Sequence, residues 1–318
     1  MIRRKILRVV FIGSPRFSVP SLEQLKINGY DVVAVYTQPD RPSGRGRTLS
    51  MSPVKEAALQ WNIPVIQPPT LRAPEALKEL AGLKPDVIVI CAFGQILPKA
   101  WIDMPPRQCL NVHFSLLPRH RGASPVAAAI LAGDEFTGVS IQLVRYKLDT
   151  GPILAAASVP IYPDDNAGTL LEKLGIVGAH LLQEALIGWL NGTLEPLPQD
   201  ESIATYFGRV KKEEGEIDWR QPAVEIWRRI RAYYPWPGCF TYWRGKQLKI
   251  NEAFYLAGEG KGEAGRVVVL PPAEGGLGII TGDGIIVVKN IQYAGKKAMT
   301  AADFLRGQRD FIGTKLPN

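Results

Sequence analysis

The sequence predicts an α/β protein whose first part is an open, mostly parallel sheet, followed by a second, smaller β-barrel domain. Continuous apolar, β-branched runs alternate with helical segments over the first 190 residues. Such runs are typical of strands buried on both faces of a parallel sheet. Beyond residue 207 the chain changes to short strand-like runs separated by Gly and Pro. That spacing is typical of a small, OB-like barrel.

The first part is expected to alternate strands with helices. A helix at Phe17–Ile27 is indicated by apolar residues at helical spacing, and a second begins at Ser52-Pro53, a Ser cap followed by Pro. Ser124-Pro125 repeats this opening before a short apolar helix. Ligands of open α/β sheets bind at the carboxyl ends of the strands. The predicted strands are Ile6–Ile12, Asp31–Thr37, Asp86–Ala92, Cys109–His113 and, further along, Val139–Val144.

A long helix is predicted over Gly168–Leu190, and a polar, Pro-bearing linker follows it. We therefore expect a catalytic domain over residues 1–190, a linker over 191–206 and a barrel domain over 207–318. The barrel domain is predicted to contain helices at Ala223–Ala232 and Ala301–Gly307. Its strands are expected at Phe240–Trp243, Gln247–Ala253, Gly265–Val269, Gly278–Ile280 and Ile285–Ile291.

Composition narrows the class of protein. The 318 residues suffice for two domains, each with its own core. No apolar run is long enough to cross a membrane. The three cysteines lie far apart without metal-ligand spacing, which predicts no metal site and a reducing, cytoplasmic location. Residues 205–318 hold 18 Lys and Arg against 12 Asp and Glu, most of the net charge of +8. This excess fits a polyanionic partner or simply a solvated basic surface.

Asn111 and His113 lie two residues apart at the end of a predicted strand, so both side chains should point to one face. An amide can donate hydrogen bonds to a developing oxyanion, and an imidazole can transfer protons near neutral pH. Asp149, in a turn-like Leu148–Gly151 segment, could orient the imidazole. A lone strand-end histidine is more often structural, and Asp-Thr-Gly usually marks a turn. The pairing with Asn111 favours a proton-transfer site.

Two loops near this site could bind a ligand. Phe93, Gly94, Ile96 and Leu97 follow a buried strand, and Ser115, Leu116, Leu117 and Pro118 follow His113. Together they could form the two walls of an apolar pocket for a flat heteroaromatic ring, or they could be ordinary loops between strands and helices. The G-x-G-x-x-G fingerprint is absent after the first strand, which argues against an NAD-binding Rossmann enzyme.

Two basic segments could contact nucleic acid. Arg41, Arg45 and Arg47 lie in a loop rich in Gly and Pro, which is either a surface loop or a mobile arm that inserts an arginine into nucleic acid. Lys296 and Lys297 follow a glycine in the basic domain and could meet phosphates or occupy a solvated turn.

Several motifs resemble the methionyl-tRNA formyltransferase family along essentially the whole chain. In the first domain the matching segments are Thr37–Pro42, Ser52–Lys55, Asn111–His113, Ser115–Pro118, Arg121–Ala123 and Leu148–Gly151. In the second domain they are Ile217–Trp219, Pro235–Pro237, Thr281–Gly284 and Ala294–Met299. The chain departs from the pattern at Phe114, at His120 and over Val144–Lys147.

The resemblance implies a Rossmann-like formyltransferase fold with an OB-like, tRNA-binding domain. It implies transfer of a formyl group from 10-formyltetrahydrofolate to methionyl-initiator tRNA, for translation initiation, by a cytoplasmic monomer. Asn111, His113 and Asp149 would form the catalytic trio. Ser115–Pro118 and the Phe93–Leu97 loop would hold the folate, and Arg45 would enter the tRNA acceptor arm. Two other functions stay open, formylation of a small amine and tRNA binding without catalysis.

Overall fold

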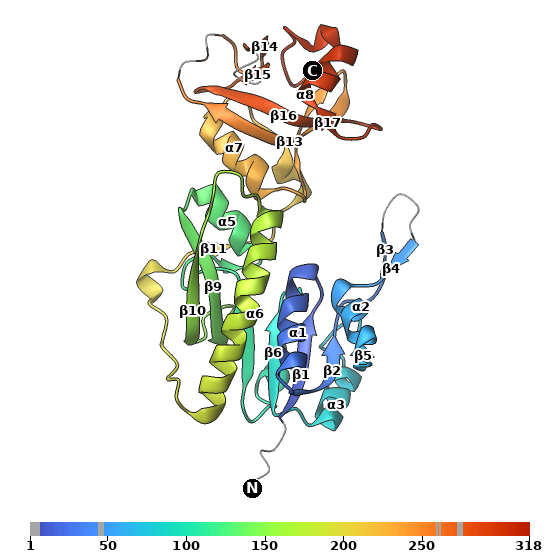
Figure 1. The fold of residues 1–318 in the computed structure, drawn as a ribbon, viewed down its shortest axis with the longest axis vertical. Helices are drawn as coiled ribbons and strands as arrows, with labels where there is room; N and C mark the ends of the chain where they lie inside the picture. Colours follow the sequence, from blue (N-terminus) through green and yellow to red (C-terminus); the bar gives the residue numbers. More distant parts are fainter. Residues whose placement is uncertain (1–6, 44–47, 259, 261, 272–275) are drawn as a thin grey trace. The chain divides into compact units, whose positions relative to one another are not determined.

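The computed structural model describes residues 7–43, 48–258, 260, 262–271 and 276–318 (Figure 1). These residues form two compact units, and each is described by itself. The first unit comprises Met1–Pro125, Phe136–Pro160 and Leu171–Gly208. The second comprises Val126–Glu135, Ile161–Leu170 and Arg209–Asn318. The chain therefore passes between the units more than once, and residues 191–208 belong to the first unit.

A seven-stranded sheet forms the centre of the first unit, in the order β10-β9-β7-β6-β1-β2-β5. The five strands from β7 to β5 are parallel, and β9 and β10 add two antiparallel strands at one edge. Residues on both faces of β1 and β6 are buried, which explains their continuous apolar runs. The mostly parallel α/β sheet predicted from the sequence is confirmed. The strands are β1 (Arg8–Gly13), β2 (Asp31–Tyr36), β5 (Val65–Ile66), β6 (Val87–Cys91), β7 (Cys109–His113), β9 (Phe136–Leu143) and β10 (Ile153–Pro160).

The helices of this unit begin where the sequence carries helix-start signals. In α2 (Pro53–Gln60) the Ser52 hydroxyl accepts a hydrogen bond from the Lys55 backbone at 3.1 Å, and Pro53 occupies the first position. The long helix α6 extends over Ala167–Asn191, and its Gly178 lies against Val112 and Val139 of the sheet. The remaining helices are α1 (Val19–Ile27), α3 (Pro74–Leu83), α4 (Lys99–Ile102) and the short 3-10 turns at Arg16–Ser18 and Glu201–Ile203.

Two pairs of very short strands complete the first unit. β8 (Arg121–Gly122) pairs in parallel with β11 (Tyr206–Phe207), so the segment after the long helix returns to the loop that follows β7. Gly122 has a φ of +108°, and a Cβ there would overlap the carbonyl oxygen of Phe207. β3 (Arg41–Ser43) pairs antiparallel with β4 (Thr48–Ser50) as a hairpin arm.

The second unit is built on an antiparallel sheet in the order β12-β13-β16-β15-β14, with β17 paired to β16. This arrangement confirms the small, barrel-like β domain predicted from the sequence. Its helix α7 (Ala223–Ala232) packs on β13, and α8 (Ala301–Gly307) packs on β16. α5 (Pro125–Ala132) also lies almost wholly in this unit, with 3-10 turns at Lys212–Gly215 and Arg309–Phe311. The strands are β12 (Cys239–Trp243), β13 (Lys246–Leu256), β14 (Val267–Val269), β15 (Leu277–Ile280), β16 (Ile285–Tyr293) and β17 (Met299–Thr300).

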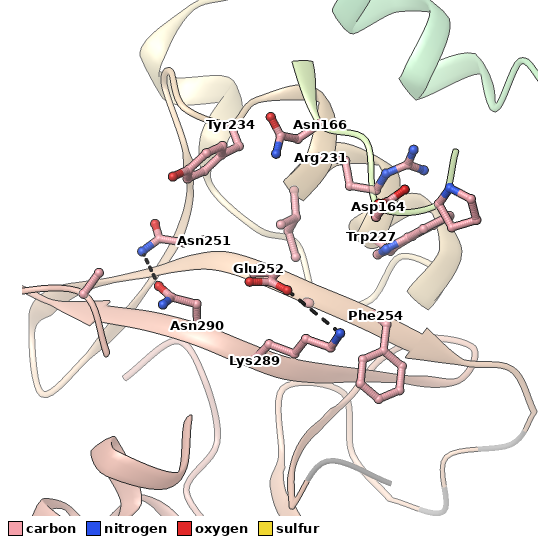
Figure 2. A pocket seen from close by; sticks show the side chains of 14 residues that line it. Asp164, Asn166, Trp227, Arg231, Tyr234, Asn251, Glu252, Phe254, Lys289 and Asn290 are labelled. Carbon is pink, nitrogen blue, oxygen red and sulfur yellow. Dashed lines mark hydrogen bonds and ion pairs between the residues drawn. The ribbon is translucent and has the colours of Figure 1, made fainter. Parts of the chain in front are cut away.

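A cavity of about 630 Å³ opens in the second unit between α7, β13 and β16 (Figure 2). The Arg231 guanidinium lies 4.3 Å from the centre of the Trp227 ring, and the Lys289 ammonium lies 3.9 Å from the Glu252 carboxylate. Asp164 adds a second carboxylate to the lining. Two cations therefore face two carboxylates, so the cavity carries no excess positive charge with which to bind phosphates.

Candidate active site

The sheet places Asn111 and His113 on one face together with two polar residues of the neighbouring strand. In the antiparallel pairing of β7 with β9, Asn111 stands opposite Gln142, and His113 stands opposite Ser140. Directly opposed residues share a face of the sheet. The alternate residues, including Val112, face the other way, toward α6. The spacing of Asn111 and His113 therefore positions both at the carboxyl end of β7, as the sequence predicts.

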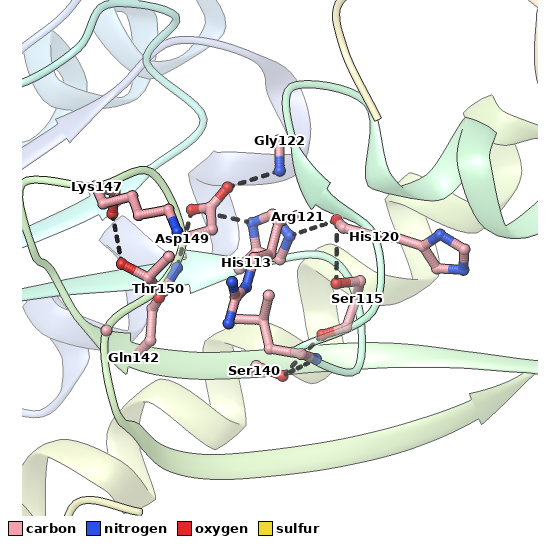
Figure 3. A network of polar contacts seen from close by, with 12 residues as sticks. His113, Ser115, His120, Arg121, Gly122, Ser140, Gln142, Lys147, Asp149 and Thr150 are labelled. Atoms are coloured by element: carbon pink, nitrogen blue, oxygen red, sulfur yellow. Dashed lines mark hydrogen bonds and ion pairs between the residues drawn. The ribbon is translucent and has the colours of Figure 1, made fainter. Parts of the chain in front are cut away.

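Asp149 meets His113 on this face, although the two residues are 36 positions apart in the sequence (Figure 3). The Asp149 Oδ1 atom lies 3.6 Å from His113 Nδ1, and both side chains are less than a tenth exposed. Its Oδ2 atom accepts a hydrogen bond from the Gly122 backbone at 2.8 Å, and Oδ1 accepts one from Gln142 Nε2 at 2.9 Å. Asp149 has a φ of +54°, a strained backbone of the kind often found at functional sites.

The other imidazole nitrogen fixes the protonation pattern of His113. Its Nε2 atom lies 3.0 Å from the His120 carbonyl oxygen, which can only accept. Nε2 must therefore carry a proton, and Nδ1, beside Asp149, is the nitrogen that can gain or lose one. The pair lies beside the cavity described next.

A cavity of about 370 Å³ lies beside the trio. Asn111 and Asp149 form part of its wall, and His113 lies next to Asp149 without being one of the lining residues. Among the residues that the structure describes, no hydrogen bond of the Asn111 amide is recorded, so the amide is available to a ligand. Most of the wall is apolar, which suits a flat ring. The other lining residues are Arg72, Ile90, Gln95, Ile96, Leu97, Ile102, Gln142, Val144, Arg145, Tyr146 and Leu148.

The expected ligand-binding residues divide into two groups. Ile96 and Leu97, from the loop after β6, line the cavity. Ser115, Leu117 and Pro118 are buried outside its lining, and Leu116 is half-buried. The Ser115 hydroxyl donates to the Arg119 carbonyl at 2.7 Å. Phe93 is buried and Gly94 is exposed, both outside the lining.

The basic residues lie elsewhere. Arg41 is exposed on β3, at the base of the arm, whereas Arg45 and Arg47 fall outside the described residues. The segment before Arg41 is held by Lys55, whose ammonium donates to Asp40 at 2.6 Å. This hydrogen bond lowers the pKa of Asp40 below its ordinary value. Lys296 and Lys297 are exposed in the turn between β16 and β17.

Sequence reasoning missed the groups that hold Asp149. Besides Gln142 and Gly122, the Gln199 amide donates to the carbonyl oxygens of Asp149, at 2.8 Å, and Gly151, at 2.6 Å. The one sequence signal for these contacts was Gln142, because a buried glutamine in the middle of an apolar strand needs a polar partner. Gln199 lies in the segment expected to be a linker, so no pattern marked it.

A buried arginine anchors that segment beside the site. The Arg121 guanidinium is fully buried and donates to Gln199, to both carboxylate oxygens of Glu201 and to the Tyr206 hydroxyl. These hydrogen bonds lower the pKa of Glu201 and raise the pKa of Arg121. The segment from 199 to 206 is therefore part of the structure around Asp149.

Neither a metal site nor a membrane helix is found in the described part of the chain. There, no group of three or more His, Cys, Asp or Glu side chains could hold a metal ion. Over the same residues, no helix is both long and apolar enough to span a bilayer.

Comparison with known proteins identifies the class. The formyl transferase family model matches residues 7–186, and the formyl transferase C-terminal domain model matches residues 209–309. The chain belongs to the formyl transferase family. It is 46% identical over 325 residues to a methionyl-tRNA formyltransferase of Dehalococcoides mccartyi, with 98% of each chain covered. It is 47% identical over 311 residues to that of Roseiflexus castenholzii, covering 98% of this chain and 99% of the relative. The resemblance to methionyl-tRNA formyltransferases is confirmed.

A solved structure shares the fold at lower identity. The N-formyltransferase of Helicobacter canadensis, in complex with folinic acid and dTDP-3-aminofucose, is 22% identical and superposes with a TM-score of 0.66. The match covers 89% of this chain and 99% of that one.

Proposed function

We propose that this protein transfers the formyl group of 10-formyltetrahydrofolate to the amino group of methionyl-initiator tRNA, for translation initiation, as a cytoplasmic monomer. The observation that carries the proposal is the meeting of Asn111, His113 and Asp149 beside an apolar cavity, in a chain of the formyl transferase family. Folinic acid bound to the Helicobacter canadensis relative supports a folate donor. No metal has a role in this proposal.

The chemistry needs an oxyanion stabilised and a proton moved. The amine of the aminoacyl group attacks the formyl carbon, and the carbonyl oxygen becomes an oxyanion to which the Asn111 amide can donate. The attacking nitrogen loses a proton, and N10 of the folate gains one as its bond to the formyl carbon breaks. His113 takes up the proton of the attacking amine at Nδ1, and Asp149, 3.6 Å away, stabilises the resulting charge. The imidazolium then returns this proton to N10 of the folate as the bond to the formyl carbon breaks.

The apolar cavity is the proposed folate site. Ile96 and Leu97 would contact the ring of the folate directly, because they line the cavity. Phe93, Gly94 and the Ser115–Pro118 segment would shape the walls from behind. The Ser115–Pro118 segment is held in place by Ser140, whose hydroxyl donates to the Ser115 carbonyl at 2.8 Å and accepts from the Leu117 backbone at 3.0 Å. These hydrogen bonds fix the segment to β9, next to Gln142.

A comparison of acceptors tests the proposal. The purified protein is given 10-formyltetrahydrofolate with methionyl-initiator tRNA, with a methionyl elongator tRNA, or with small amines such as an amino-sugar nucleotide. We expect rapid formylation of the initiator tRNA alone. Preference for the small amine would replace the proposed acceptor. Binding of tRNA without formyl transfer would make the protein a binding module.

The arm between β3 and β4 is proposed to contact the acceptor arm of the tRNA through Arg41, Arg45 and Arg47. Arg45→Ala should raise KM for initiator tRNA and leave the Kd for the folate donor unchanged, because a contact with tRNA phosphates or bases adds nothing to folate binding. Steady-state kinetics with each substrate varied in turn measure both. A normal KM for the tRNA in this variant would show that Arg45 makes no contact that matters for tRNA use.

The barrel domain, proposed to span 207–318, should bind the tRNA phosphates electrostatically. Lys296 and Lys297 are exposed side by side in one turn. Affinity for the tRNA should fall as salt rises, and the double variant Lys296→Ala, Lys297→Ala should flatten the slope of log K against log[salt] by about 1.4–1.8. Filter binding over a salt series measures this. An unchanged slope would show that these lysines make no phosphate contact.

A further inference from the structure

Gln142 makes a contact that the proposed mechanism does not use. Its side chain is only 2% exposed, on β9 directly opposite Asn111, and it lines the cavity beside the trio. Its Nε2 atom donates to Asp149 Oδ1 at 2.9 Å. This is the same carboxylate oxygen that faces His113 Nδ1 at 3.6 Å (Figure 3).

The orientation of the Gln142 amide follows from its partner. An ionised carboxylate accepts hydrogen bonds and donates none, so the amide nitrogen, not the oxygen, must face Asp149. The Gln142 Oε1 atom is then left buried without a hydrogen-bond partner among the described residues. An unpaired buried acceptor is unfavourable for folding. A methionine of similar size would avoid that penalty, but it would take a hydrogen-bond donor away from the buried carboxylate of Asp149.

We propose that Gln142 is a positioning residue for the catalytic carboxylate. Its amide holds Oδ1 from one side while the Gly122 backbone holds Oδ2 from the other, so the carboxylate cannot rotate away from His113. Both donors are uncharged, so neither competes with the imidazolium as an ion-pair partner of the carboxylate. Because formyl transfer is itself a proposal, the role of Gln142 rests on it.

The first test separates positioning from structure. Gln142→Met keeps the volume and removes the donor. We expect kcat to fall about 10–100-fold, the loss expected when a catalytic group is displaced. The loss should appear in kcat and not in KM for the tRNA, and a thermal midpoint close to that of the parent protein would show that the fold is kept. Gln183→Met is the matched control, because Gln183 on α6 also has a buried, unpaired Oε1 atom and lies outside the site. It should retain full activity.

A second variant, Gln142→Glu, should have a kcat that depends on pH differently from that of the parent protein. Gln142→Glu keeps the shape, but its carboxyl group can donate to Asp149 only when protonated. We expect the ratio of its kcat to that of the parent protein to rise between about pH 8 and pH 6, because a carboxyl group beside a carboxylate is protonated more readily. The ratio for Gln142→Met should stay flat. The other titratable groups around the cavity are common to all variants: Arg72, His113, Arg145, Tyr146 and Asp149.

The outcomes are distinct. If the parent protein transfers no formyl group, the proposed function fails and Gln142 is not at issue. If the parent protein is active and Gln142→Met retains its kcat, the positioning role is overturned. A flat pH ratio for Gln142→Glu would overturn it as well, even if the methionine variant failed to fold. A fall in kcat accompanied by an equal loss in Gln183→Met would show a general effect of the substitution.

Discussion

Replacing His113 with alanine is expected to lower kcat for formyl transfer by about 10²–10⁴-fold, the usual contribution of general acid–base catalysis. The folate donor and the tRNA should still bind, because His113 is not one of the residues that line the cavity. Single-turnover rates with charged initiator tRNA, together with equilibrium binding of each substrate, measure the two quantities separately. Asp149→Ala should cause a loss of the same order, since it removes the partner of Nδ1.

His180 provides the control for this substitution. It is an exposed histidine on α6, and His180→Ala should leave the rate unchanged. If His113→Ala and Asp149→Ala were combined, the double variant should lose little more than either single variant, because the two residues act as one unit. A near-normal rate in either single variant would remove the pair from the mechanism.

The sequence predicted the parts of the site that depend on local geometry. Asn111 and His113 share a face because any strand alternates its side chains, so their spacing alone was sufficient. The mostly parallel sheet followed from continuous apolar runs such as Val87–Cys91. The capped start of α2 at Ser52-Pro53 is equally local, and the structure confirms it.

The contacts of Asp149 could not be derived in this way. Gln142 reaches it because β9 pairs antiparallel with β7, and Gly122 reaches it through a backbone group that carries no side-chain signal. Strand β10 and helix α3 were also absent from the predicted elements. The segment around Tyr206–Phe207 resembled a linker because a two-residue strand has no periodicity to detect.

Replacing Asn111 with alanine is expected to lower kcat by about 10²–10³-fold, the typical loss of one oxyanion-hole donor. Asn111 lines the cavity and is only half-buried, and no intramolecular partner of its amide is recorded among the described residues. The substitution therefore leaves no buried group unpaired, and the thermal midpoint should hardly change. KM for the folate should also be nearly unchanged, since the hydrogen bond from the Asn111 amide is needed most when the oxyanion develops.

Asn111→Asp tests the same role by placing a negative charge where the oxyanion develops. The carboxylate has nearly the shape of the amide, but it carries a negative charge and no donor, so it should repel the oxyanion and lower kcat at least as far as alanine does. The new carboxylate would also stand directly across from Gln142, whose Nε2 now serves Asp149. The two carboxylates would then compete for the Gln142 amide, which would weaken its hydrogen bond to Asp149. If Asn111→Asp retained more activity than Asn111→Ala, the amide would act by shape or by hydrogen bonding to the attacking amine, and oxyanion stabilisation would have to come from another group on the cavity wall.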